Sequence, residues 1–289
     1  MDVGITMPGV GVDPAAFARH AEELGLESLW HGDHLIPVTP FLDSTMVMAA
    51  TAAVTTRIGL GFGVMVLALR PVAWAAKQVA TLQRLSGNRV LLGVGAGGDP
   101  HGDAAWHAVG VPFAERGSRT DAALRVLPGL VRGEPTPLNG RDVVLAPGAP
   151  VPPLLVGGDS RAALRRAARF GDHWYPSFAT TARIAAGVRE LADLAAAHGR
   201  PTPGVTAGVP VALGDVPASA LERRVRAMRD YGLGEEQARE VLVTGTPERA
   251  AERFAELAEA GVDRVVAMPF TDDRFRQAEL VARAAAARP

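Results

Sequence analysis

RIGLGFGVMVLALRPVAWAAKQVATLQRLSGNRVLLGVGAGG (57–98) contains two short apolar runs separated by a longer amphipathic stretch. The runs at 57–66 and 88–98 are continuously apolar, which is typical of strands buried on both faces. The stretch between them is predicted to form a helix that begins at Pro71, because proline suits the first helical position. Two strands joined in this way are predicted to pair in parallel, since parallel neighbours need a crossover connection.

The same alternation continues on both sides of this segment. Before it, strands are predicted at 3–8 and 27–34, and an Asp13-Pro14 pair is typical of the start of the helix between them. After it, further apolar runs alternate with helices, at 152–158, 172–176, 204–212 and 263–270. A closed barrel and a doubly wound sheet both fit this alternation. The count of about eight strands and the lack of a domain-boundary linker favour an α/β fold of one (β/α)8-barrel domain over residues 1–289.

Composition excludes several functional classes. Hydrophobic residues make up 48% of the chain, which is enough to fill a large core. The 30 Lys and Arg against 31 Asp and Glu leave no basic excess, which disfavours a nucleic-acid partner. The chain has no cysteine, so disulfides, thiol catalysis and thiolate metal sites are excluded, as fits a reducing cytoplasm. No apolar run approaches the roughly 18 residues of a membrane helix and the amino terminus lacks a signal-peptide pattern, so we expect a cytoplasmic protein without a membrane partner.

Chemistry in such barrels lies at the carboxyl ends of the strands, so the residues just after each apolar run are the candidates. The strand at 27–34 ends in HGDH, whose imidazoles and carboxylate suit proton transfer, although a polar loop with ordinary hydrogen bonds is the plainer interpretation. A metal-dependent hydrolase would use the polar residues of this segment: His31, Asp33 and His34. A zinc site would need a third ligand, at which Asp99, His101 and Asp103 only hint. The hydrolase would also need carboxylates or histidines at the last strand ends, where the acidic residues lie too late, in predicted helix starts. We therefore expect no metal site.

Glycines gather at two other predicted strand ends. GVGAGG (93–98) formally satisfies a dinucleotide fingerprint, but no helix opens at once, so close approach of a flat ligand explains it better. In PPLLVGGDSRAAL (152–164), Gly157 and Gly158 end a strand where a helix begins, so backbone N–H groups are predicted to face a phosphate. Capping of that helix by Asp159 or Ser160 is an equally good explanation of this polar turn.

Five segments taken together resemble the luciferase-like family of flavin and deazaflavin oxidoreductases. They are ESLWHGDH (27–34), the 57–98 segment with its ATL..LS..R..LG.G.G pattern, VGVPFAERGSRTDAAL (109–124), PPLLVGGDSRAALRRAARFGDHW (152–174) and VTGTPERAAERFAELAEAGVDRVV (243–266). Each motif is modest alone, but the five occur in order over nearly the whole chain. The resemblance implies a luciferase-like TIM barrel with a reduced insertion after the fourth strand.

The resemblance also implies which residues face the cofactor. Gly63 and Val64 match a non-proline cis peptide that backs the cofactor ring. Asp33 and His34 match residues near the reactive edge of the ring, where His34 would handle a proton and Asp33 would orient it or contact the ring. Two further pairs complete the cofactor site: Ala96 and Gly97 at the ring or its ribityl chain, and Gly157 and Gly158 at the phosphate.

The activity that the resemblance implies is a hydride transfer between coenzyme F420 and a small organic substrate. The short chain and the Ala-, Arg- and Gly-rich composition favour F420 over FMN. With FMN, the protein would be a monooxygenase that uses oxygen and reduced flavin from a partner reductase. A flavin-binding protein without turnover is a hypothesis of another class. The family is commonly dimeric, so we expect a homodimer.

Two departures from the family concern the substrate. Sugar-phosphate dehydrogenases of the family carry a tryptophan and a glutamate where this chain has Val38 and Gly98. We therefore expect a different substrate, hydrophobic or weakly polar, because the sequence has no basic cluster that would bind a polyanion. A pocket that serves either turnover or flavin binding alone is predicted from large apolar residues, some of which are also expected in the core: Met7, Phe62, Met65, Trp74 and Trp174.

Overall fold

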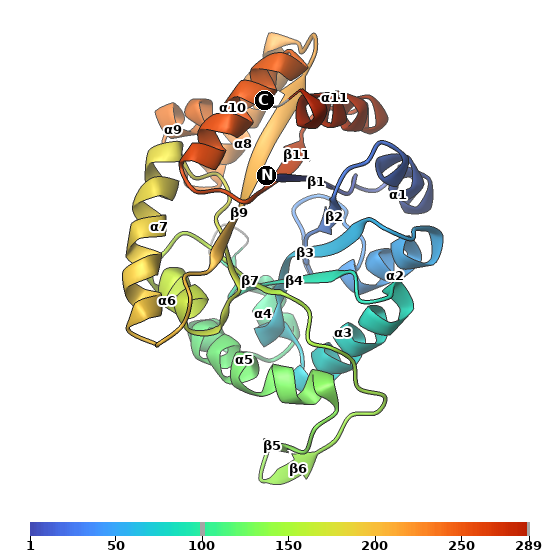
Figure 1. Ribbon diagram of the computed structural model, residues 1–289, viewed down its shortest axis with the longest axis vertical. Coiled ribbons are helices and arrows are strands. Elements are labelled where there is room, and N and C mark those ends of the chain that lie inside the picture. The colour runs from blue at the N-terminus through green and yellow to red at the C-terminus, as the bar shows by residue number, and fades with distance from the viewer. Residues whose placement is uncertain (99–101, 288–289) are drawn as a thin grey trace.

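A computed structural model describes residues 1–98 and 102–287, and eight of the strands in these ranges form a closed parallel barrel (Figure 1). The barrel strands are β1 (Asp2–Thr6), β2 (Ser28–His31), β3 (Gly59–Val66), β4 (Val90–Gly95), β7 (Leu154–Gly157), β8 (His173–Tyr175), β9 (Gly204–Leu213) and β11 (Arg264–Pro269). Strand β9 pairs with β8 on one side and with β11 on the other, and β11 pairs with β1, so the ring has no open edge. The barrel predicted from the alternation of strands and helices is confirmed, and the doubly wound sheet is excluded.

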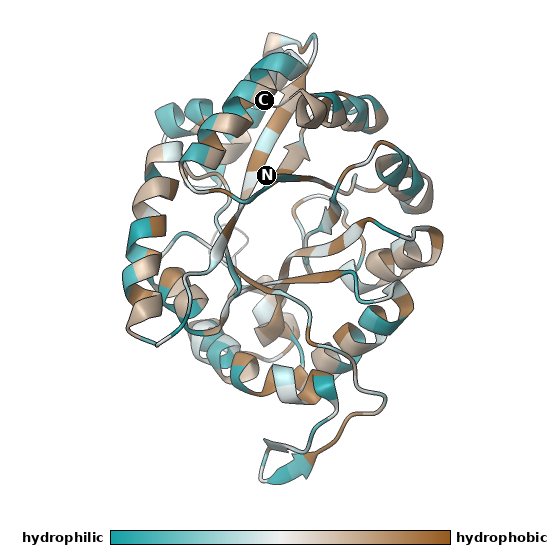
Figure 2. Cartoon of the chain, viewed as in Figure 1, coloured by the Kyte–Doolittle hydropathy of each residue, from teal (hydrophilic) through white to brown (hydrophobic). Residues whose placement is uncertain are grey.

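Helices cover the outside of the barrel (Figure 1). They are α1 (Pro14–Glu23), α2 (Ser44–Val54), α3 (Val72–Ser86), α5 (Arg116–Arg132), α6 (Arg161–Phe170), α7 (Thr181–Ala196), α10 (Pro247–Glu259) and α11 (Arg274–Ala286), with α8 (Ala218–Asp230) and the short α9 (Glu235–Glu240) between β9 and β10. The predicted cap of α1 is present, since the Asp13 carboxylate accepts a hydrogen bond from the N–H of Ala15 at 2.9 Å. Hydrophilic residues lie mainly on the outward helix surfaces (Figure 2).

Alternate residues of each strand face either the helices or the barrel interior. On β2, Leu29 packs into the large core between strands and helices, whereas Trp30 packs inside the barrel with Tyr175 and Val266. The indole of Trp30 is fully buried and donates to the Ser28 hydroxyl at 2.7 Å. A side chain at Gly61 would place its Cβ 2.2 Å from the indole, so this strand glycine makes room for Trp30.

Several elements of the structure are not among those expected from the sequence. Helix α2 is one, and the short helix α4 (Ala104–Ala108) lies in a stretch expected to be a loop. The Pro- and Gly-rich segment before β7 contains an antiparallel hairpin, β5 (Thr136–Leu138) and β6 (Arg141–Val143), which projects away from the barrel in Figure 1. Strand β10 (Val243–Gly245) extends the sheet from β9 without entering the ring. In the part of the chain described, no helix is both long and apolar enough to span a membrane.

Candidate active site at the carboxyl ends of the strands

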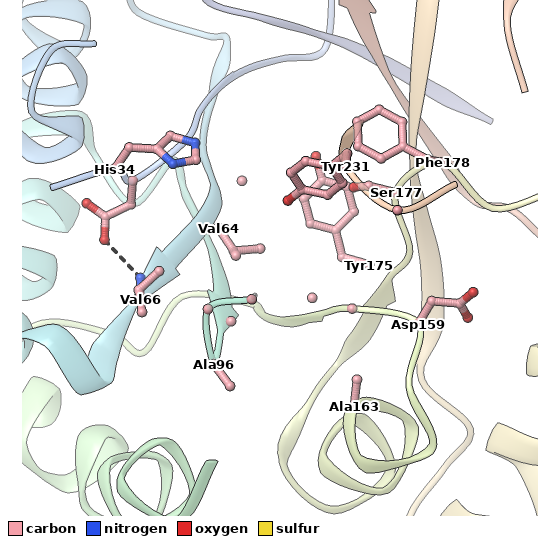
Figure 3. Close-up of a pocket in the computed structure, with 18 of the residues that line it drawn as sticks. His34, Val64, Val66, Ala96, Asp159, Ala163, Tyr175, Ser177, Phe178 and Tyr231 are labelled. Carbon is pink, nitrogen blue, oxygen red and sulfur yellow. Dashed lines mark hydrogen bonds between the residues drawn. The ribbon is translucent and has the colours of Figure 1, made fainter. Parts of the chain in front are cut away.

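A cavity of about 720 Å³ opens at the carboxyl ends of the barrel strands (Figure 3). Its wall includes every residue that the sequence assigned to the catalytic or cofactor site: Asp33, His34, Gly63, Val64, Ala96, Gly97, Gly157 and Gly158. These residues come from four segments far apart in the chain, which the parallel barrel brings to one end.

The floor of this cavity is built around Val64. The peptide bond between Gly63 and Val64 is cis, as the resemblance implied, and β3 carries a bulge here, because its register with β4 shifts between Phe62 and Met65. Glycines on the neighbouring strands make room for the Val64 side chain. A Cβ at Gly95 would lie 2.5 Å from Val64 Cγ2, and one at Gly157 would lie 2.7 Å from Val64 Cγ1.

Asp33 holds the strand just beyond this bulge. Its carboxylate accepts a hydrogen bond from the N–H of Val66 at 2.8 Å and from the Ser44 hydroxyl at 2.9 Å. Both of its oxygens also accept from Arg70, at 2.6 and 2.8 Å, in an ion pair with a side chain of Asp33 that is 6% exposed. Asp33 therefore lines the cavity, while its carboxylate fixes the loop after β2, the end of β3 and the start of α2 relative to one another.

The two histidines of HGDH lie in different environments. His34 is exposed, lines the cavity and packs edge-on against Phe41 with ring centroids 5.1 Å apart. His31 is buried, stacks on Phe41 at 4.3 Å and bonds through Nε2 to the carbonyl oxygen of Leu42 at 3.1 Å. Burial lowers the pKa of His31, against the opposing effects of the Leu42 carbonyl and Asp33. Of the two, only His34 is placed to exchange protons with a molecule in the cavity.

The opposite wall is formed by the end of β8 and by the α8–α9 region. Figure 3 shows Tyr175, Ser177, Phe178 and Tyr231 together, across Val64 from His34. Tyr175 is 3% exposed, and burial raises the pKa of its phenol, although a hydrogen bond with Ser177 opposes the shift. The phenol therefore keeps its proton at neutral pH, so it serves as a hydrogen-bond donor and not as a base.

At the far end of the cavity the amino terminus of α6 lies beside Gly158. Ser160 is the N-cap of this helix, and its hydroxyl accepts from the N–H of Ala163 at 3.2 Å. Asp159 is turned away from the centre of the cavity in Figure 3 and pairs with Arg183, Nη2 to Oδ1, at 2.7 Å. Burial nevertheless raises its pKa, because Arg183 offsets the loss of solvation only in part. A carboxylate beside a phosphate would repel it, but the Asp159 carboxylate is paired with Arg183.

The comparison with known families agrees with this geometry. A model of the luciferase-like monooxygenases matches residues 12–264. The chain belongs to the luciferase-like monooxygenase family. An uncharacterised protein of Mycobacterium tuberculosis is 43% identical over 141 residues, which are 47% of this chain and 48% of that protein. The F420-dependent glucose-6-phosphate dehydrogenase of Kineococcus radiotolerans is 35% identical over 173 residues, 55% of this chain and 50% of that enzyme. The matches therefore span about half the length of these relatives.

The luciferase-like fold is shared over the full chain with a solved structure. An F420-dependent secondary alcohol dehydrogenase in complex with an F420-acetone adduct has a TM-score of 0.86 to this chain at 17% sequence identity. The likeness covers 100% of this chain and 99% of that one.

The large apolar residues that the sequence assigned to the pocket do not line this luciferase-like cavity, so that prediction is wrong. Met7, Phe62, Met65 and Trp174 are all buried in the core, because they lie on the faces of their strands that turn toward the helices. Trp74 is 67% exposed and borders a separate surface groove between α2 and α3. Of the two positions that differ from the sugar-phosphate dehydrogenases, Val38 is 82% exposed and Gly98 lines the cavity.

The metal hypothesis gains no support from the luciferase-like site. The ring of His31 is engaged with Phe41 and Leu42, and the carboxylate of Asp33 with Arg70. No group of three or more His, Asp or Glu suited to a metal ion occurs in the described ranges. The other ligands considered, Asp99 and His101, lie outside the described residues, while Asp103 is at the N-cap of α4.

Sequence reasoning missed several residues of the cavity wall. Tyr175 and Ser177 follow the apolar start of β8 directly, so their position at a strand end was a usable signal. Arg166, on α6, lines the cavity and pairs with Asp121 at 2.6 Å. Arg224, on α8, also lines it, and no sequence pattern distinguishes this arginine from its neighbours Arg223 and Arg226.

Proposed function

We propose that this luciferase-like protein is an F420-dependent oxidoreductase that transfers a hydride to or from a small organic substrate. The observation that supports it most is the arrangement of Val64, His34 and Gly158 along one cavity. The floor at Val64 suits a flat ring system, and the α6 amino terminus beyond Gly158 suits the phosphate of its side chain. The relative from Kineococcus, named as an F420-dependent enzyme, supports this cofactor over FMN.

The residues present fit such a cofactor. At Gly157 and Gly95 a Cβ would collide with Val64, so no larger side chain covers the floor. Gly158 has a φ of +114° and presents its backbone without a side chain at the amino terminus of α6. When bound, F420 supplies a carbon that accepts or donates a hydride.

In this proposal the side chains of the protein provide orientation and a proton. His34, at the exposed edge of the cavity, takes the hydroxyl proton of an alcohol substrate as its hydride leaves, or returns a proton in the reverse direction. Asp33 positions the floor through Val66, since its carboxylate is already committed to Ser44, Val66 and Arg70. Tyr175 donates a hydrogen bond from the opposite wall.

Parallel calorimetric titrations of the purified protein with oxidised F420 and with FMN test the cofactor. Tight binding of F420 with little binding of FMN is expected, and assays would then use alcohols, imines and activated alkenes. Preference for FMN would replace the proposal with an oxygen-using monooxygenase served by a partner reductase, as the family description also allows. Tight binding of either cofactor without turnover across these substrates would favour a flavin-binding protein, and binding of neither would reject the proposal.

We also propose that residues 1–289 act as one domain, in the cytoplasm, and associate as a homodimer. The support for the dimer is an apolar surface on α2 and α3, where Trp74 and Leu85 are 67% and 64% exposed and line a groove of about 230 Å³, and Met46 on α2 is 71% exposed. Exposed apolar patches of this kind mark association sites. Light scattering after size exclusion should give twice the monomer mass, and Trp74→Lys should shift the mass toward that of the monomer.

A further inference from the structure

Arg224 is a cation in the cavity wall that the proposed chemistry does not use. It lies on α8, is half-buried and lines the cavity on the side of Tyr231 and Phe178. Its guanidinium carbon lies 5.5 Å from the ring centroid of Phe178 and 5.6 Å from that of Phe270. Two aromatic rings thus flank the charged group, which limits its rotation and its access to water.

This guanidinium has no counter-ion among the residues that the structure describes. The other arginine of the wall, Arg166, is paired with Asp121 at 2.6 Å, whereas Arg224 makes no ion pair in that part of the chain. Its Nε is buried and has no hydrogen-bond partner there. The nearest charge that acts on it is a second cation, and burial together with Arg274 lowers the pKa of Arg224. A buried donor without a partner costs free energy, so the site is suited to an anion that arrives with a ligand.

The backbone around Phe178 is shaped to hold this arrangement. Phe178 has a φ of +60°, in the left-handed region that a bulky side chain rarely adopts. Its N–H donates to the carbonyl oxygen of Gly208 at 3.2 Å, and its ring packs edge-on against Tyr231 at 5.8 Å. Conformations of this kind occur preferentially at ligand sites, where the surrounding structure enforces them.

We propose that Arg224 binds a carboxylate of the substrate, and that the substrate is a small, largely apolar organic acid. Its acidic end lies at Arg224 between Phe178 and Phe270, and its reacting carbon lies over Val64 beside His34. This assignment rests on the proposed function, because it supplies the substrate class for that site. A guanidinium forms paired hydrogen bonds with one carboxylate.

The surroundings favour a carboxylate over a phosphate. The neighbouring residues of the wall are mainly apolar or aromatic, namely Phe178, Met228, Tyr231 and Leu233. Gln237, the amide in this part of the wall, donates its Nε2 to the carbonyl oxygen of Phe178, and Arg274 donates to that of Pro269. An apolar lining of this kind suits a singly charged carboxylate better than a doubly charged phosphate. This proposal narrows the expected hydrophobic or weakly polar substrate to an apolar one with a single negative charge.

The test compares acids with their uncharged amides. Phenylacetate, 3-phenylpropanoate and 4-phenylbutanoate, each with its amide, would be titrated calorimetrically into the protein with and without bound cofactor. The variants are Arg224→Gln and Arg224→Met, the second of which keeps the unbranched stem between the rings. Arg226→Gln is the matched control, because Arg226 is an exposed arginine on the same helix.

For at least one pair, the wild type and Arg226→Gln should bind the acid roughly 10- to 100-fold more tightly than the amide. Both Arg224 variants should lose this preference while their affinity for the cofactor stays within about threefold of wild type. Equal affinity for acid and amide, no binding of any pair, or a preserved preference in both Arg224 variants would overturn the assignment. A loss of cofactor affinity as large as the loss of acid affinity would also overturn it, because Arg224 would then serve the cofactor. Failure of wild-type protein to bind either cofactor would reject the proposed function alone, since the titrations without cofactor still report on Arg224.

Discussion

Adding one methyl group at Gly157 should disturb the cavity floor more than a substitution at any loop contact would. The Cβ of Gly157→Ala would lie 2.7 Å from Val64 Cγ1, which is 0.7 Å less than the 3.4 Å where ordinary contact begins. Gly157 is paired with Tyr175 of β8, and the residues on either side of the β3 bulge, Phe62 and Met65, are paired with β4, so neither backbone moves away freely. Such overpacking typically costs about 1–3 kcal/mol, and we expect unfolding free energy to fall by that amount.

The structure also predicts how to relieve this clash. The new methyl carbon would lie 3.6 Å from Val64 Cβ, an ordinary contact, so removal of the Val64 methyl groups should make room for it. In a Val64→Ala background, Gly157→Ala should therefore cost less than about 0.5 kcal/mol, which gives a favourable coupling of about 1–2 kcal/mol. Val64→Ala alone should cost about 1 kcal/mol, since Val64 is only half-buried.

Urea unfolding of the four proteins measures this cycle, and F420 titration of the same samples reports on the floor. Gly157→Ala should bind the cofactor more weakly, because the displaced Val64 side chain moves into the space above it. Gly9→Ala is the matched control, since no atom lies within 4 Å of its added Cβ, and it should change stability by less than about 0.5 kcal/mol. The reasoning is refuted if Gly157→Ala is as stable as the control, or if its cost is the same in the Val64→Ala background.

Three further predictions concern the polar residues of the HGDH segment. His34→Ala should leave cofactor affinity nearly intact and lower turnover about 10²- to 10⁴-fold in steady-state assays, whereas unchanged turnover would remove the proton-handling role. Asp33→Asn should lower the unfolding free energy by about 3 kcal/mol or less in urea titrations, because Arg70 loses its partner while remaining partly exposed. A loss of activity without a loss of stability would contradict a positioning role for Asp33. Burial lowers the pKa of His31 below its ordinary value of about 6.5, so as the pH falls through that value the unfolded chain binds more protons than the folded one and stability falls. The melting temperature should fall between pH 7 and pH 5, and it should fall less in His31→Gln; equal falls would show that His31 does not carry the effect.

The elements that sequence reasoning found are those with a strong periodic or boundary signal. Most barrel strands are largely apolar runs, and Asp13-Pro14 marks the start of α1. Helix α2 was missed because its segment, STMVMAATAAV, is apolar on nearly all sides and shows no helical periodicity, although Asp43 caps it through the Met46 N–H at 2.9 Å. The β5–β6 hairpin did carry a signal, since Asn139 and Gly140 both have positive φ in the turn that this pair favours.

The candidate site was predictable on the side where backbone dominates. The glycines at strand ends and the residues around Gly63 form short motifs of adjacent residues, so the cavity floor and the end near α6 were predicted from the sequence. The opposite wall is made by side chains such as Phe178 and Arg224, whose relation depends on how α8 packs against the segment that follows β8. No spacing in the sequence encodes that packing, and the apolar residues chosen for the pocket instead face the helices.

The cavity floor and the α8–α9 wall should respond differently to substitution. The floor is fixed from two sides, by glycines that fit around Val64 and by the Asp33 carboxylate that holds the N–H of Val66 at 2.8 Å. A change there shifts the backbone under the cofactor, so it should alter the affinity of the protein for the cofactor whichever substrate is used. The α8–α9 wall has its own small apolar cluster, separate from the main core, against which Phe178 packs. Substitutions at Arg224 can therefore change the choice of substrate while the cofactor site stays intact, which is the separation that the titrations of acids, amides and cofactor measure.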